Sequence, residues 1–183
     1  KVISTVIHIK NNLISYFNKK EIENKLLKKF LGLNVETINI CNANCTFCGY
    51  QYQTRETGCM DRKLFEKIIL EYVEIGGGDL GLTPTVGEPL ADKYLLERIK
   101  FARTFDKIKK IGFYSNLISL ARFNSKDFVN SGVTDLVVST SGLDQDMYKR
   151  VYRSNEYNRM YNNLINLLKE NNNSGNPINI TVD

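Results

Sequence analysis

The stretch CNANCTFC at residues 41–48, here called the cysteine loop, places three thiols in one short segment: Cys41, Cys45 and Cys48 in a C-x3-C-x2-C spacing. A cubane iron–sulfur cluster takes four ligands, normally all thiolates, so three cysteines leave one iron open to a substrate or cofactor. A structural zinc site usually has four ligands in two separated pairs, and the sequence has no second pair. Because three of the four cysteines of the chain fall within this loop, it indicates a metal cluster rather than unrelated thiols.

The cysteine spacing, with Phe47 directly before the third cysteine, resembles the cluster motif of the radical S-adenosylmethionine (radical SAM) superfamily. The resemblance implies that Cys41, Cys45 and Cys48 hold a [4Fe-4S] cluster whose open iron takes the amino nitrogen and carboxylate of S-adenosylmethionine. It also implies an activity. An electron from a reductant such as flavodoxin or ferredoxin lets the cluster cleave the cofactor to methionine and a 5′-deoxyadenosyl radical, which abstracts hydrogen from a substrate.

The composition is that of one globular domain with a sizeable core: 183 residues, 42% hydrophobic and 25% charged. The net charge of +5 comes from scattered lysines without an aromatic-basic stripe, so we expect no nucleic-acid partner. Apolar runs are short and interrupted, so we expect no membrane association. Clustered cysteines do not form a disulfide framework. An oxygen-sensitive cluster also requires a reducing compartment, so we expect a cytoplasmic protein.

Strand-like and helix-like segments alternate after residue 34. We expect strands at 35–40, 79–83, 108–114, 134–139 and 177–182. We expect helices after the capping residues Asp61 and Asp92, and at 125–130, 144–152 and 156–170. This alternation predicts parallel βαβ units, in a doubly wound sheet or a barrel. The resemblance favours a partial (βα)6 barrel, with its site at the carboxyl ends of the strands.

The domain organisation follows from the same pattern. Residues 1–34 are predicted to be an N-terminal extension with a strand at 2–9 and a helix at 19–31, and residues 35–183 the core. The core contains five of the six strands of the family barrel. We therefore expect a barrel truncated after the fifth strand, in a fragment of a longer protein.

The segment Val86-Gly87-Glu88-Pro89 follows the second expected strand and resembles the family's Gly-Gly-Glu-Pro segment, with valine in place of the first glycine. Glycine lets the backbone approach a ligand closely, and a glutamate can accept a hydrogen bond from an ammonium group. The resemblance implies that Val86, Gly87 and Glu88 bind the amino group of S-adenosylmethionine. The alternative is a surface turn made by Gly and Pro. The glycine run at 76–78 precedes its strand and is interpreted as a helix stop.

The third and fourth expected strands also end in polar residues. Ser115 and Asn116 stand where relatives often have Thr-Asn, and Ser139 stands where relatives have a serine near the cofactor ribose. Ser141 replaces an acid that is common in the family. The resemblance implies that these four residues line the cofactor site. Ordinary strand-end turns are the alternative.

The segment 148–153, Tyr-Lys-Arg-Val-Tyr-Arg, also resembles relatives. Arg153, ahead of Arg150, is a candidate partner for the cofactor carboxylate, the alternative being a solvated helix face. Cys59 is interpreted as an idle thiol, with a redox or substrate-linking role as the alternative. His8 is the only histidine, so acid–base catalysis by histidine is not expected. Three residues after the cysteine loop are candidates for shaping the pocket or for ordinary packing: Tyr50, Tyr52 and Arg55.

Two functions remain open from the sequence. The first is a radical SAM enzyme acting on a peptide or carbohydrate-type substrate, because the pattern between the second and fourth strands is similar to relatives that modify such molecules. The second is a non-catalytic iron–sulfur or zinc module for electron transfer or interaction, in which water or an external residue supplies the fourth ligand. Metal content and cleavage of S-adenosylmethionine distinguish the two.

Overall fold

The structure, a computed structural model, describes residues 18–21 and 32–183. The chain divides into two compact units, residues 1–31 and residues 32–183. In the first unit, residues 18–21 are helical and overlap the start of the helix expected at 19–31. The rest of that helix and the strand expected at 2–9 lie outside the described residues. The boundary at residue 34 stays a prediction.

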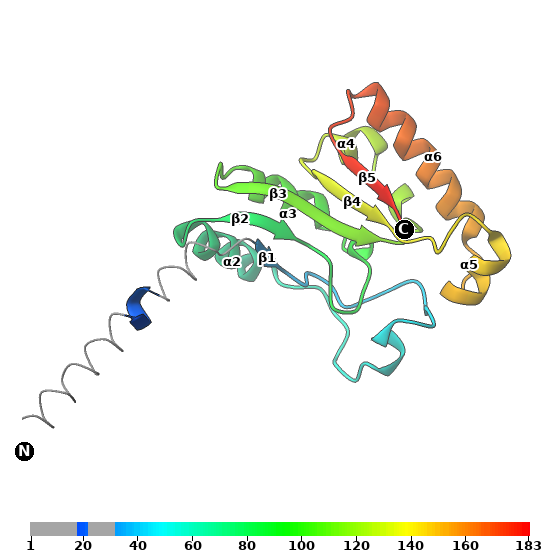
Figure 1. Ribbon diagram of the computed structural model, residues 1–183, viewed down its shortest axis with the longest axis horizontal. Coiled ribbons are helices and arrows are strands. Elements are labelled where there is room, and N and C mark those ends of the chain that lie inside the picture. Colours follow the sequence, from blue (N-terminus) through cyan, green and yellow to red (C-terminus); the bar gives the residue numbers. More distant parts are fainter. Residues whose placement is uncertain (1–17, 22–31) are drawn as a thin grey trace, which may run out of the picture. The chain divides into compact units, whose positions relative to one another are not determined.

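Five parallel strands form one sheet in the second unit, in the order β1-β2-β3-β4-β5 (Figure 1). Their bounds are Gly32–Asn34, Gly78–Gly81, Ile108–Ser115, Asp135–Val138 and Asn179–Val182. Strands that are neighbours in sequence are also neighbours in the sheet, so the strand order never reverses as it does in a doubly wound sheet. The prediction of an α/β fold with the parallel strands of a partial barrel is confirmed. The sheet is not closed into a full barrel.

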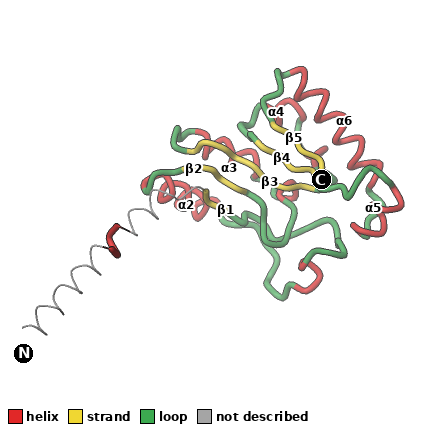
Figure 2. Tube along the Cα trace, in the orientation of Figure 1, coloured by secondary structure: helices red, strands yellow, loops and turns green. Residues whose placement is uncertain are grey.

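Helices connect the strands, and Figure 2 shows helix and strand alternating along the trace. Within residues 32–183, the α-helices are α2 (Arg62–Glu74), α3 (Leu95–Arg103), α4 (Ser125–Val129), α5 (Gln145–Tyr152) and α6 (Tyr157–Asn173). The same residues include three short 3-10 helices, η1 (Gly49–Tyr52), η2 (Pro89–Ala91) and η3 (Leu120–Arg122). Within the described ranges, no helix has the length and apolar character needed to cross a bilayer.

Of the two expected helix caps, Asp61 is present and Asp92 is not. The Asp61 carboxylate accepts hydrogen bonds from two backbone N–H groups in the first turn of α2, at 2.8 and 3.2 Å. Asp144 caps α5 by accepting from the Met147 N–H at 2.6 Å. The prediction for Asp92 was wrong, because α3 begins only at Leu95. Asp92 is fully buried and instead binds the Arg98 guanidinium at 2.9 Å.

The core lies between the sheet and the helices, and apolar periodicity explains which side chains enter it. Phe65 and Ile69 on α2 are buried, as are Leu80 on β2 and Leu136 on β4. Burial of each such side chain stabilises the fold by roughly 1.5–3 kcal/mol. Leu64, next to Phe65 on α2, is about half exposed.

The first strand lies upstream of its predicted position at 35–40, so that prediction was wrong in its boundaries. The Val35 N–H donates to the Gly81 carbonyl at 2.9 Å, and parallel pairing ends there because β2 ends at Gly81. The chain then continues in an extended form and makes an antiparallel bridge between Ile38 and Cys59. This second pairing leads the backbone past the carboxyl end of β1 toward Cys41.

The glycine run at 76–78 ends α2, as predicted. Gly77 has φ +69°, and a Cβ atom at this position would lie 2.6 Å from the Lys107 carbonyl oxygen. The Gly77 N–H donates to the Tyr72 carbonyl at 2.8 Å and so closes the helix. Only a residue without a side chain fits this turn.

Candidate active site

The cysteine loop lies at the carboxyl ends of the strands, beside α5 (Figure 1). Residues 35–40 connect the end of β1 to the start of the loop. The Ile40 carbonyl, one residue before Cys41, accepts a 2.9 Å hydrogen bond from the Glu88 N–H. The segment after β2 that contains Gly87 and Glu88 is therefore adjacent to the start of the cysteine loop, as expected for parallel strands whose carboxyl ends meet.

The far half of the cysteine loop is tied to the end of α5. The Thr46 N–H donates to the Val151 carbonyl at 2.8 Å, and the Asn44 N–H donates to the Tyr152 carbonyl at 3.4 Å. The Phe47 ring meets the Tyr152 ring edge-on, with centroids 5.7 Å apart. Both neighbours of Cys45 are thus held by one helix end. The sequence placed α5 near the site, but it did not reveal these contacts.

The near half of the loop is tied to the segment after β3 by Asn42, a residue that sequence reasoning missed. Its side-chain oxygen accepts from the Asn116 amide at 2.8 Å, and its own amide donates to the Ser119 hydroxyl at 2.9 Å. An amide side chain both donates and accepts. Its position between two candidate metal ligands was the available signal.

Glu88 is the centre of a buried polar group. Its Oε1 accepts from the Ser115 hydroxyl at 2.6 Å and from the Leu90 N–H at 3.0 Å, and its Oε2 accepts from the Asn116 N–H at 2.9 Å. Burial raises the pKa of Glu88, and these three donors oppose that rise. The carboxylate therefore joins the segment after β2 to the end of β3. A carboxylate has about four acceptor positions, and three of them are used by these donors.

Gly87 makes a close approach to the protein's own backbone. Its φ is +144°, and a Cβ atom there would lie 2.7 Å from the Ile38 carbonyl oxygen. The neighbouring Val86 is buried. These two residues hold the segment after β2 against the extended chain that leads to Cys41. Their contact with a cofactor stays a prediction.

The three thiols of the cysteine loop influence one another electrostatically. Burial is the main cause that raises the pKa of Cys41 to about 11, and the nearby Glu88 and Cys48 add to it. Burial also raises the pKa of Cys45 to about 12, with further contributions from Cys41 and Cys48. Across the described ranges, no three Cys, His, Asp or Glu side chains are close enough to enclose an ion as they stand. Binding of one ion by all three thiols therefore requires side-chain movement within the loop.

A cavity of about 510 Å³ opens beside the cysteine loop. It is lined by Cys41, Asn42, Ala43, Asn44, Tyr50, Gln51, Arg153 and Ser154. The volume lies within the range of small-molecule sites. Arg153 ends α5 with φ +49°, and its guanidinium donates to the Gln51 side-chain oxygen at 3.0 Å. The structure thus brings Arg153 to Cys41, with Gln51 and Ser154 as lining residues that the sequence did not indicate.

The residues after β4 lie next to the end of β3. The Ser139 N–H donates to the Ser115 carbonyl at 2.9 Å. The Thr140 and Ser141 N–H groups both donate to the Asp183 carbonyl, at 2.8 and 3.1 Å, and the Thr140 hydroxyl donates to the same oxygen at 3.1 Å. The loop after β4 is therefore anchored by the residue that follows β5.

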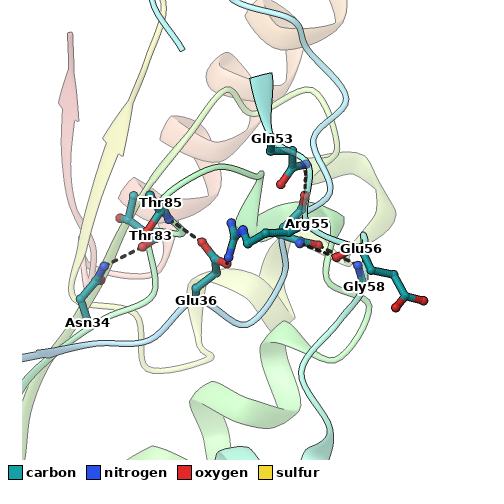
Figure 3. A network of polar contacts seen from close by, with 9 residues as sticks. Asn34, Glu36, Gln53, Arg55, Glu56, Gly58, Thr83 and Thr85 are labelled. Carbon is teal, nitrogen blue, oxygen red and sulfur yellow. Dashed lines mark hydrogen bonds and ion pairs between the residues drawn. The ribbon is translucent and has the colours of Figure 1, made fainter. Parts of the chain in front are cut away.

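Arg55, a candidate for shaping the pocket, lies in a polar network at the edge of the site (Figure 3). It pairs with the Glu36 carboxylate, whose other oxygen accepts from the Thr85 N–H at 2.8 Å. Arg55 thus braces the segment after β2 through Glu36. Cys59 is exposed, and the charges that act on its pKa include Asp92 rather than the cysteine loop.

The comparison with known proteins agrees with this geometry. A profile described as "Radical SAM superfamily" matches residues 35–182. The GTP 3′,8-cyclase of Vibrio parahaemolyticus serotype O3:K6 (strain RIMD 2210633) is 24% identical over 149 residues, which cover 79% of this chain and 44% of the relative. The chain therefore spans less than half the length of this relative.

Two solved structures share the fold. BtrN in complex with AdoMet and 2-DOIA has a TM-score of 0.59 and 19% identity, with 84% of this chain and 56% of BtrN covered. Native anSMEcpe with bound AdoMet and Cp18Cys peptide has a TM-score of 0.61 and 17% identity, with 82% and 42% covered. Enzymes of the matched family use a [4Fe-4S] cluster and S-adenosylmethionine. The match over residues 35–182 shows that this chain belongs to the radical SAM superfamily.

Proposed function

We propose that residues 35–183 are a core region of a radical SAM enzyme in which Cys41, Cys45 and Cys48 hold a [4Fe-4S] cluster. The observation that carries this proposal is the cavity of about 510 Å³, which Cys41 lines together with Arg153. Three thiolates fit a cubane cluster with one open iron, and the cavity is large enough for a small-molecule cofactor. When bound, the cluster supplies the electron that cleaves S-adenosylmethionine to a 5′-deoxyadenosyl radical.

The chain's own residues bind and orient the cofactor in this proposal. The Arg153 guanidinium pairs with the cofactor carboxylate, because a guanidinium and a carboxylate form strong charge-assisted hydrogen bonds. Glu88 accepts from the amino group with its remaining acceptor position, supported by Val86 and Gly87. The other proposed cofactor-site residues are Phe47, Ser115, Asn116, Ser139 and Ser141.

The substrate that we propose is a peptide or a carbohydrate-type molecule, and the proposed electron donor is flavodoxin or ferredoxin in the cytoplasm. The structure of anSMEcpe, which shares this fold, holds a peptide. The relative named GTP 3′,8-cyclase adds GTP to the substrates to be assayed. Hydrogen abstraction needs the reacting atoms to be held close together, and the cavity beside Cys41 offers a place for a cofactor next to the cysteine loop.

The test uses the full-length protein, reconstituted anaerobically with iron and sulfide and then reduced. We expect about four irons per chain and the formation of 5′-deoxyadenosine and methionine from S-adenosylmethionine. A variant with all three loop cysteines changed to Ala is the control, and it should form neither product. Zinc in place of iron, or a full cluster that leaves bound cofactor intact with candidate substrates present, would overturn this proposal in favour of the non-catalytic module.

A further inference from the structure

Tyr148, on the inner face of α5, has a buried hydroxyl that the fold does not satisfy. The side chain is fully buried, and its ring stacks on Tyr152 with centroids 4.6 Å apart. Its hydroxyl oxygen has no hydrogen-bond partner within the part of the chain that the structure describes. An unpaired buried hydroxyl costs roughly 1–3 kcal/mol. A native fold that retains such a group calls for an explanation, such as a catalytic role or a partner that is not a protein group.

The helix that carries Tyr148 is fixed against the cysteine loop. The backbone N–H groups of Asn44 and Thr46, on either side of Cys45, donate to carbonyls in the last turn of α5. Tyr148 lies about one turn earlier on that helix. The ring positions are set by packing on Tyr152 and by an edge contact with Tyr157 at 5.7 Å.

Tyr148 and Cys45 are both buried and belong to the same core cluster. The residues on either side of Cys45 are hydrogen-bonded to the last turn of the helix that carries Tyr148. Burial raises the pKa of the Tyr148 hydroxyl, so the hydroxyl stays a donor. Glu88 already accepts three hydrogen bonds from other groups, whereas a neutral thiol at Cys45 is only a weak acceptor.

We propose that the Tyr148 hydroxyl donates a hydrogen bond to the cluster sulfur at the Cys45 position and so tunes the reduction potential of the cluster. This inference rests on the proposed function. A metal-bound cysteine is a thiolate, which is a better acceptor than the neutral thiol. Hydrogen bonds to the sulfurs of an iron–sulfur cluster help to set its potential. A donor stabilises the reduced cluster more than the oxidised one, because the reduced cluster carries more negative charge.

The test compares Tyr148→Phe with Tyr157→Phe in full-length, anaerobically loaded protein. Tyr157 is a matched control because its ring contacts the Tyr148 ring edge-on, while its hydroxyl already donates to the Leu143 carbonyl at 2.7 Å. Redox titration followed by electron paramagnetic resonance gives the midpoint potential. At a fixed applied potential, we expect up to a tenfold lower ratio of reduced to oxidised cluster in Tyr148→Phe. A tenfold change corresponds to about 59 mV for one electron.

A second measurement, the thermal unfolding of cluster-free protein, keeps the inference separable from a structural role. Tyr148→Phe should unfold no earlier than the parent protein, because no hydrogen bond is lost, whereas Tyr157→Phe should unfold earlier. A fully loaded Tyr148→Phe with the parent's potential would overturn the inference. So would a destabilised cluster-free Tyr148→Phe, or a shift that appears only with S-adenosylmethionine present, since the acceptor would then be the cofactor. Failure of the parent protein to hold iron would instead overturn the proposed function.

Discussion

The Ser115 hydroxyl donates a 2.6 Å hydrogen bond to the Glu88 carboxylate. Ser115 is the last residue of β3, whereas Glu88 lies in the segment after β2. The same carboxylate also accepts from the Asn116 N–H at 2.9 Å. Through this contact, the segment after β2 and the end of β3 behave as one unit. A change at Glu88 therefore affects both the expected ammonium contact and the placement of two other candidate site residues.

Glu88→Gln should weaken binding of S-adenosylmethionine about tenfold while the cluster is retained. Glutamine replaces one carboxylate oxygen by an NH2 group, which cannot accept a hydrogen bond, and it removes the negative charge. Loss of a charged hydrogen bond costs roughly 1.5–3 kcal/mol. Anaerobic calorimetry measures the affinity, and iron analysis measures the cluster. Glu97→Gln, which changes an exposed acid on α3, is the control. Unchanged affinity in a folded Glu88→Gln protein would remove Glu88 from the site.

The proposed ligand set predicts which cysteine variants lose iron. Cys41→Ala, Cys45→Ala and Cys48→Ala should each lose the cluster, because a cubane held by two thiolates is poorly retained. Cys59→Ala should keep it, since that thiol is exposed and lies beside a different set of charges. Iron and sulfide counts after anaerobic reconstitution report the result. Loss of iron in Cys59→Ala alone would show that the ligand assignment is wrong.

Asn42→Ala should loosen the cysteine loop. The substitution removes two hydrogen bonds to the segment after β3, each contributing roughly 0.5–1.5 kcal/mol. We expect faster amide hydrogen exchange at residues 41–48 and slower cluster assembly. Asn44→Ala is the control in the same loop, because its side chain makes no hydrogen bond within the described residues. Equal exchange in the two variants would argue against a bracing role for Asn42.

The raised pKa values of Cys41 and Cys45 predict an unusual pH profile for the cluster-free protein. With a pKa of about 12 against an ordinary 9, Cys45 stays protonated at pH 8, and alkylation by iodoacetamide should be about a hundredfold or more slower than in the unfolded chain. Because both thiols have a higher pKa in the folded chain than in the unfolded chain, they bind their protons more tightly when the protein is folded. Their contribution to the free energy of unfolding is therefore fully present below pH 9 and is lost as the pH rises toward 11 and 12. Mass spectrometry of alkylated peptides across pH measures the profile. Rapid alkylation of folded Cys45 near neutral pH would contradict it.

Arg153→Gly should separate stability from cofactor binding. Arg153 has a left-handed backbone with φ +49°, which costs a side-chain-bearing residue about 1–2 kcal/mol. Glycine removes that cost and loses the hydrogen bond to Gln51, so the unfolding free energy should change by less than about 1 kcal/mol. Affinity for S-adenosylmethionine should fall about tenfold, while Arg150→Ala on the exposed face of α5 should not change it. If Arg153→Gly and the parent protein bind S-adenosylmethionine with equal affinity, Arg153 has only a structural role.

Local patterns predicted most of the fold, and long-range pairing accounts for what they missed. The cap at Asp61 and the pattern that predicted a strand at 134–139 identified elements within a few residues of their bounds, because these signals depend on neighbouring residues. The first strand was misplaced because its extent depends on where β2 ends. Asp92 was assigned as a cap because sequence does not show that Arg98 lies against it in the core.

The candidate site follows the same division. The cysteine spacing and the Gly87-Glu88 segment are local and were found directly. The bond between Asn42 and Asn116 joins residues 74 positions apart, and no pattern within either segment indicates the other. The contacts of Cys45's neighbours with α5 are of the same kind. Their prediction requires knowing how the loops meet at the strand ends.

The Asp183 carbonyl that binds the loop after β4 has a consequence for folding during synthesis. Thr140 and its anchor are 43 residues apart, which at typical rates of synthesis means roughly 2–9 s between them on the ribosome. All three loop cysteines emerge before that anchor exists. In the proposed assembly, the cluster is therefore expected to enter after the fifth strand has left the ribosome, when the loop after β4 is anchored.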